Sequence, residues 1–167
     1  MKTEKMRELL KVLMKNSKLS DREIAKRLDC SQPTVTRLRR FLEKQGWIRS
    51  YTIVPEFGKV GYKILAFTFS SLKTYPNREK AVEIIQKAVE WLRTRPNVIY
   101  ATDGQGLGGK DIVMISFHKD YDDYTRFMHE YALDWGEIVS SFESFMTNLN
   151  SDFIMRKFDL AHLADDL

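Results

Sequence analysis

Residues 21–38 read DREIAKRLDCSQPTVTRL, which has the spacing of two short helices joined by a tight turn. Ile24 and Ala25 supply the buried side of the first helix. Its start carries a capping-box pattern, because the Ser20 hydroxyl can accept the N–H of Glu23 while the Glu23 carboxylate accepts the N–H of Ser20. We therefore predict a helix that begins directly after Ser20.

The second helix of this stretch has its own start signal. Ser31 is a favourable N-cap, and Pro33 is tolerated in the first turn because its missing N–H would be unpaired there anyway. Asp29 lies in the turn where a positive φ is commonly needed, and aspartate tolerates that conformation. With a preceding amphipathic helix, the arrangement predicts a helix-turn-helix, whose second helix enters the major groove of DNA. Its expected buried residues are Val35, Leu38 and Leu42.

The opposite side of the second helix is cationic. At 100° per residue Arg37, Arg40 and Lys44 face outward, and arginine can read guanine bidentately. Arg39 lies nearer the flank, where we expect it to contact phosphate. The plainer alternative is a charged face that is only solvated. The candidate DNA-binding residues are Ser31, Gln32, Thr34, Thr36, Arg37, Arg39, Arg40 and Lys44.

Charge is distributed unevenly along the chain. Residues 1–50 hold 14 Lys/Arg against 6 Asp/Glu, a net of +8, whereas residues 51–167 hold 13 against 17, a net of −4. A basic first third joined to an acidic remainder indicates a module that binds a polyanion, here double-stranded DNA, next to a module of another kind.

From Trp47 onward the sequence pattern changes. Residues 47–54 are rich in aromatic and β-branched side chains and predict a strand. A linker at 55–61 then separates a helix-turn-helix domain at 1–54 from a second domain at 62–167.

The second domain alternates strands and helices in the order βαββαβ, which predicts an α+β fold with a ferredoxin-like antiparallel sheet. In its first helix Val82, Ile85, Val89 and Leu92 form the expected apolar side. The tail allows an edge strand at 153–155 and a short helix at 160–167. The expected strands are 62–71, 97–102, 111–118 and 138–149, the helices 77–94 and 121–131, and the glycine-rich turn 104–109.

Taken together, these residues resemble the leucine-responsive and asparagine regulator (Lrp/AsnC) family of transcription regulators. The resemblance covers about residues 5–149. It implies a winged helix-turn-helix regulator that binds DNA, forms homodimers or larger homo-oligomers through its sheet domain, and in many members binds an amino acid. The residues that carry it are Ile24-Ala25, Ser31, Thr34-Val35-Thr36-Arg37, Leu42-Glu43, Gly46-Trp47-Ile48, Tyr51 and Val60-Gly61.

The amino-acid effector is expected at the glycine-rich turn. The resemblance places it there, and glycines let a backbone come close to a ligand while free N–H groups hold a carboxylate. Asp111 would then hold the α-amino group. The alternative is a long hairpin turn without a ligand. The candidate effector-binding residues are Gly106, Gly108, Gly109 and Asp111.

The strand at 62–71 has apolar residues on both faces, with Phe67 and Phe69 on one and Ile64 and Ala66 on the other. Helices can cover only one of these faces, so the other requires a partner. We therefore expect at least a homodimer through residues 62–149.

Catalytic and metal-binding patterns are missing from the sequence. The three histidines have no metal-ligand spacing and Cys30 has no cysteine partner, so we expect no metal, no cofactor and no enzyme. No apolar run approaches the roughly 20 residues that span a bilayer, and a lone cysteine suits a reducing compartment, so we expect a cytoplasmic protein.

Two alternatives remain open at this stage. One is an enzyme resembling sirohaem decarboxylases, which would need a pocket formed by His118, His129, Lys110 and Lys119. The other is an interaction module that does not bind DNA.

Overall fold

The computed structural model describes residues 2–74 and 76–167, which form two compact units. We call residues 2–54 with 155–167 the helical unit and residues 55–154 the sheet unit. The sequence had assigned all of 62–167 to the second domain. The structure corrects this at the C-terminal end, because 155–167 packs with the helical unit. Residues 55–61, expected as a linker, belong to the sheet unit.

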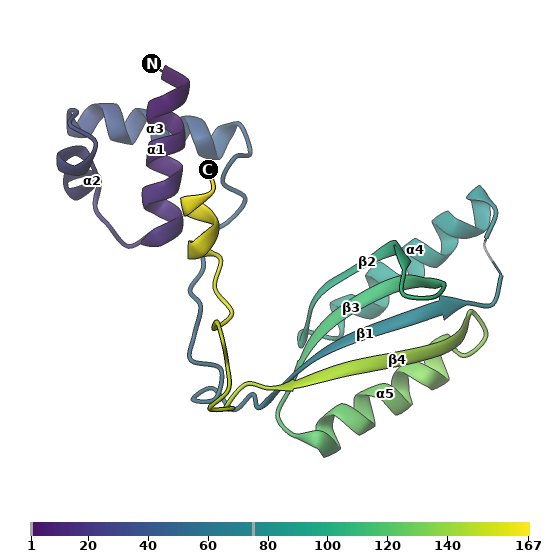
Figure 1. The fold of residues 1–167 in the computed structure, drawn as a ribbon. Helices are drawn as coiled ribbons and strands as arrows, with labels where there is room; N and C mark the ends of the chain where they lie inside the picture. The colour runs from purple at the N-terminus through teal and green to yellow at the C-terminus, as the bar shows by residue number, and fades with distance from the viewer. Residues whose placement is uncertain (1, 75) are drawn as a thin grey trace. The chain divides into compact units, whose positions relative to one another are not determined.

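The helical unit consists of α1 (Lys2–Lys15), α2 (Asp21–Arg27), α3 (Gln32–Lys44) and the C-terminal tail (Figure 1). The capping box before α2 is formed as predicted, and the Ser31 side chain caps α3. Asp29 has φ 44°, which confirms the turn expected between them. The side chains at the centre of the core are fully buried: Leu9, Ile24, Val35 and Leu42.

Residues 47–54 do not form the predicted strand. A strand requires a neighbour to pair with its backbone N–H and C=O groups, and none of the described residues provides one here. β-branched and aromatic composition alone therefore overpredicted regular structure.

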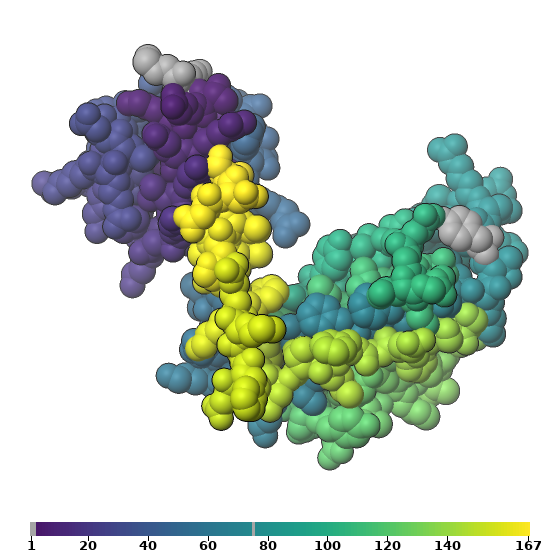
Figure 2. Space-filling model, in the orientation of Figure 1, coloured from purple at the N-terminus to yellow at the C-terminus, as the bar shows by residue number. Residues whose placement is uncertain are grey.

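The tail ends in a short 3-10 helix, η1 (Ala161–Asp165), which lies within the short helix that the sequence allowed at 160–167. It packs against α1, as Figure 2 shows for the yellow C-terminal residues beside the purple ones. Ala164 is buried in this contact, and Asp165 forms an ion pair with Lys15. Residues 153–155 do not form the edge strand that the sequence allowed.

The sheet unit has the predicted ferredoxin-like order of strands and helices. Its four-stranded sheet is ordered β2-β3-β1-β4, and all neighbouring strands are antiparallel. The elements are β1 (Ile64–Leu72), α4 (Arg78–Arg93), β2 (Val98–Gly106), β3 (Lys110–His118), α5 (Tyr121–Trp135) and β4 (Val139–Asn148).

Among the described residues, no helix is long and apolar enough to cross a membrane.

Helices α4 and α5 share one hydrophobic cluster with Met114 of β3. In α5 the buried residues include Phe127, Met128 and Tyr131. The prediction of which side of α4 is buried is wrong, because Ile84, Ala88 and Trp91 pack into the cluster instead. The exposed fractions of the residues expected to be inside are 51% for Val82, 60% for Ile85 and 46% for Val89. Both sides of α4 carry apolar residues at helical spacing, so periodicity alone could not choose between them.

Candidate nucleic-acid interface

The start of α3 is fixed by a local polar arrangement. The Ser31 hydroxyl accepts the backbone N–H of Thr34 at 3.4 Å and lies 2.8 Å from the Thr34 hydroxyl. Both side chains, which the sequence named as DNA-binding candidates, therefore satisfy each other at the cap. This contact orders the first turn of α3.

The outward face of α3 carries a hollow of about 600 Å³ that we call the α3 hollow. The cationic residues predicted to face outward, Arg37, Arg40 and Lys44, are all exposed. Within residues 2–74 and 76–167, no ion pair engages their side chains. The hollow is thus a cationic surface whose charges are not consumed inside the chain. Its lining residues are Gln32, Pro33, Thr36, Arg37 and Arg40.

The Thr36 hydroxyl and the Arg39 guanidinium group both bond to α2, although Thr36 also lines the hollow. The Thr36 hydroxyl donates to Asp21 Oδ2 at 2.6 Å, and Arg39 Nε donates to Asp21 Oδ1 at 2.8 Å. Burial raises the pKa of the Asp21 carboxyl, but hydrogen bonds from Thr36 and Arg39 outweigh it and leave that pKa below its ordinary value. The role of Asp21 could not be predicted from the sequence, because its hydrogen-bond partners Thr36 and Arg39 lie 15 and 18 residues further along the chain.

The candidate effector residues lie around a tighter turn than expected. Strand β2 continues to Gly106, which pairs with Lys110, so the turn itself is 107–109 rather than 104–109. Gly106, Gly108 and Gly109 all have positive φ, and a Cβ added at any of them would meet nothing within 4 Å. Their conformation, rather than a close contact in this chain, explains these glycines.

Asp111, the fourth candidate effector residue, is already engaged in the sheet unit. Its Oδ2 accepts the backbone N–H of Leu72 at 2.8 Å. The preceding residue, Lys110, contacts Ser141 at 3.4 Å and pairs with Glu143 at 2.9 Å. The start of β3 is therefore tied to the end of β1 and to β4.

A second hollow, which the sequence did not predict, lies at that place. We call it the β4 hollow; its volume is about 300 Å³. Trp135, at its wall, has a buried Nε1–H without an acceptor among the described residues. The sequence contained one signal for this hollow: Ser140 and Ser141 place two hydroxyls at the start of a strand that directly follows a helix. The polar and aromatic lining comprises Lys73, Tyr131, Trp135, Ser140, Ser141 and Phe142.

Among the described residues of the sheet unit, no helix or strand covers the middle of the sheet face opposite α4 and α5. Cross-strand partners Phe67 and Phe145 lie on this open face, beside Ile115 and Phe69. Phe145 is 67% exposed. At one end of the face, Phe57 stacks on Phe117 with ring centroids 4.5 Å apart.

The histidines and lysines that a sirohaem-decarboxylase pocket would need do not line a common pocket. His118 is fully buried, with Nε2 2.8 Å from the Ser116 hydroxyl, and burial lowers its pKa despite nearby Asp123. Lys110 begins β3 and His118 ends it, so the strand separates them. In the described part of the chain, no three His, Cys, Asp or Glu side chains are grouped as metal ligands would be.

Comparisons with protein families and with related proteins agree with a helix-turn-helix in the helical unit. A family model described as winged helix-turn-helix DNA-binding matches residues 2–49. The HTH-type transcriptional regulator LrpA of Pyrococcus horikoshii is 32% identical over 110 residues, covering 59% of this chain and 75% of that protein. Another HTH-type transcriptional regulator of the same organism is 30% identical over 145 residues, covering 86% and 84%.

Solved structures show the same fold over nearly the whole chain. Escherichia coli AsnC superposes with a TM-score of 0.71 at 21% identity, covering 93% of this chain and 96% of its own. A transcriptional regulator of Neisseria meningitidis, solved as a complex with L-Met, gives a TM-score of 0.75 at 20% identity and covers 95% and 97%.

Proposed function

The chain belongs to the Lrp/AsnC family of helix-turn-helix transcription regulators, and from that membership we propose how it recognises DNA. The N-terminal half of α3 enters the major groove, and side chains around the α3 hollow read base edges. The observation that carries this proposal is the exposed cationic face of α3, which has no ion pair among the described residues and lies opposite the buried Val35 and Leu38.

The position of each side chain on α3 suits it to a different contact with DNA. Arg37 and Arg40 are long, exposed and forked, which suits bidentate contact with guanine. Gln32 at the first turn suits adenine or phosphate, and Lys44 at the far end suits phosphate. Ser31 and Thr34 keep the first turn ordered and so hold Gln32 in position.

Selection of bound sequences from random DNA tests this proposal. The purified protein is expected to enrich a short motif, and the Arg37→Ala variant should relax preference at one position of it. The matched control is Arg93→Ala, which removes the same exposed charge from α4 and should enrich the unaltered motif. Retention of DNA without any enriched motif would contradict base reading.

We propose further that the protein acts as a homodimer, joined through the open sheet face. Phe67, Phe69, Ile115 and Phe145 form an apolar surface that a second copy of the same face would cover. Two-fold symmetry would then present two α3 helices to successive major grooves. The two half-sites should be about 10 base pairs apart, or a multiple of that.

The regulated form involves an amino acid bound at the β4 hollow. Support comes from its size, which matches a small ligand, and from the polar residues Lys73, Ser140 and Ser141 that line it. Asp111 and Lys110 contact the rim of this hollow through Leu72 and Ser141. The bound effector is thereby proposed to change the position of the segment that carries the glycine turn. This change would alter the assembly of the subunits and, with it, the spacing of the two α3 helices.

Calorimetric titration with each of the twenty amino acids tests the effector. At least one should release heat, and Asp111→Asn should weaken its binding, since it keeps an acceptor for Leu72 but loses a negative charge near the hollow. Asp103→Asn, an exposed carboxylate on β2, is the matched control and should bind as the parent does. No heat with any amino acid would remove the effector and leave the turn a role in assembly alone.

A further inference from the structure

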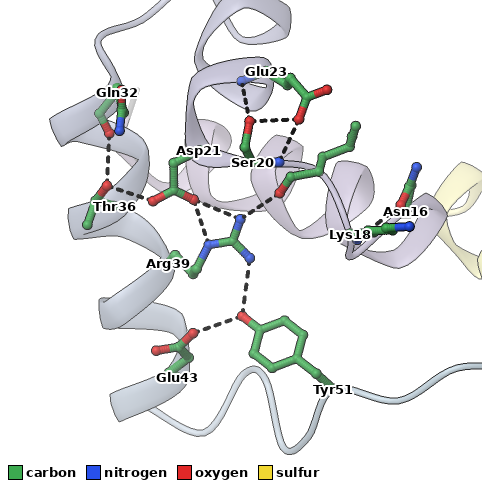
Figure 3. Close-up of polar contacts among 11 residues, drawn as sticks. Asn16, Lys18, Ser20, Asp21, Glu23, Gln32, Thr36, Arg39, Glu43 and Tyr51 are labelled. Carbon is green, nitrogen blue, oxygen red and sulfur yellow. Dashed lines mark hydrogen bonds and ion pairs between the residues drawn. The ribbon is translucent and has the colours of Figure 1, made fainter.

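Three separate segments of the helical unit converge on the guanidinium group of Arg39 (Figure 3). Its Nε donates to Asp21 Oδ1 at 2.8 Å, at the start of α2. Its Nη2 donates to the carbonyl of Leu19 at 3.4 Å, and its Nη1 lies 3.5 Å from the hydroxyl oxygen of Tyr51. The side chain thus joins the turn before α2, α2 itself and the segment that follows α3.

The Asp21–Arg39 pair is shielded from solvent. The side chains are 20% and 18% exposed, and Arg39 Nη2 also lies 2.8 Å from Asp21 Oδ1. Asp21 accepts the Thr36 hydroxyl as well, so one carboxylate bonds two successive turns of α3. Because two guanidinium nitrogens contact one partly buried carboxylate oxygen, this pair is more rigid than an exposed ion pair.

Tyr51 connects α3 to the segment that leaves the helical unit. Its hydroxyl donates to Glu43 Oε1 at 2.8 Å and lies near Arg39, so it contacts two side chains one turn apart on α3. In the described chain, Tyr51 carries the side-chain hydrogen bonds that attach residues 49–54 to α3. Residues 49–54 have no regular secondary structure to hold them in any other way.

From these contacts we propose that Asp21, Arg39 and Tyr51 form a positioning relay for DNA recognition. Arg39 does not contact phosphate. It fixes the angle of α3 against α2 at one end and transmits the position of residues 49–54 to α3 at the other. The inference rests on the proposed function of α3, because a relay of this kind matters only if α3 reads DNA.

The relay and a phosphate contact predict opposite results for conservative changes. Lysine keeps the charge of Arg39 but cannot bond Asp21 and Tyr51 together. Arg39→Lys should therefore weaken binding to the selected DNA motif about tenfold, with binding to random DNA and its salt dependence unchanged. Arg40→Lys is the matched control on the outward face; there, the charge-preserving change should leave the salt dependence unchanged while altering the preferred base.

Asp21→Asn and Tyr51→Phe test the other two members. Asn removes a negative charge beside the DNA-binding face, so electrostatics alone would strengthen binding to all DNA. The relay predicts the reverse for the selected motif: a lower ratio of specific to random binding. Tyr51→Phe lies outside the core and should lower the same ratio. Combined with Arg39→Lys it should add little, because the two share one hydrogen-bond network.

The outcomes separate this inference from the proposed function. If Arg37→Ala weakens motif binding while Arg39→Lys stays within twofold of the parent, the relay is wrong and groove reading stands. Tighter binding by Asp21→Asn with an unchanged ratio would also overturn the relay. If Arg37→Ala and Arg40→Ala both leave motif binding unchanged, the proposed role of α3 fails. Thermal unfolding of each variant confirms that the helical unit remains folded.

Discussion

The helical unit closes its own core, whereas the sheet unit leaves half of its sheet uncovered. In the first, Leu9, Ile24, Val35 and Leu42 have no exposed surface, and the outward face of α3 carries Arg37, Arg40 and Lys44. In the second, Phe145 is 67% exposed on a face that no described helix of the unit covers. Such an apolar face is typical of a surface that binds a partner.

This difference shows how the chain divides its tasks. A finished core with a cationic surface suits a partner that is itself a polyanion and is held largely by charge. An unfinished apolar face suits a permanent partner, and an identical copy has the complementary surface by symmetry. We therefore propose that DNA recognition and assembly belong to units with opposite surface chemistry.

The largest expected effect comes from damage to the finished core. Leu42→Ala should lower the free energy of unfolding of the helical unit by about 2–5 kcal/mol, because it opens a cavity that neighbours fill only partly. Urea unfolding followed by circular dichroism measures the change. Leu163→Ala, 55% exposed on η1, is the control and should cost far less. Equal losses would mean that the core is not the stabilising feature of this unit.

On the open face, a truncation should act on assembly rather than folding. Phe145→Ala is expected to weaken dimerisation by about 2 kcal/mol, as central interface aromatics commonly do. Analytical ultracentrifugation over a range of protein concentrations would measure it. Val82→Ala on the exposed side of α4 is the control, and its dimer should be unaffected. A parent protein that is monomeric at micromolar concentration would contradict the assembly through this face.

A smaller effect is expected at the start of α2. Ser20→Ala removes the acceptor for the N–H of Glu23 and should destabilise the helical unit by about 1 kcal/mol. Ser17→Ala, in the exposed turn before it, should have little effect. Thermal unfolding of the two variants distinguishes a working cap from a merely exposed serine.

Signals that act over a few residues were predictable from the sequence. The Ser20–Glu23 box, the Ser31 cap and the positive φ of Asp29 each depend on neighbours within about four positions, and all three are present. The family and the two-domain α+β fold were predicted correctly as well, because the order of strands and helices is written in successive local patterns.

Features that depend on distant partners were not predictable. Arg39 looks like a flanking cation until Asp21 and Tyr51 are placed around it. Residues 47–54 look like a strand, yet pairing requires a neighbour that the described chain does not provide. The tail could not be assigned, because its contact with α1 joins residues 150 positions apart. In each case the deciding energy comes from tertiary contact rather than from propensity.

The smallest effect concerns that tail. The hydrogen bond from Lys15 holds the pKa of the Asp165 carboxyl below its ordinary value of 3.8. A lowered pKa means that the contact stabilises the folded tail above pH 3.8 and is lost as pH falls through the lowered value. Amides of η1 should therefore exchange faster with solvent in acid. Asp165→Asn should remove this pH dependence; if the variant keeps it, the ion pair does not attach the tail.

The most direct test of the account is the affinity of α3 for its DNA motif. Fluorescence anisotropy with the selected motif should show Arg37→Ala binding weaker by roughly 1–3 kcal/mol, while Arg93→Ala binds as the parent does. For the parent, log K should fall linearly with log salt between about 50 and 200 mM. An unchanged affinity for Arg37→Ala in a folded protein, together with a flat salt dependence, would contradict DNA recognition by the outward face of α3.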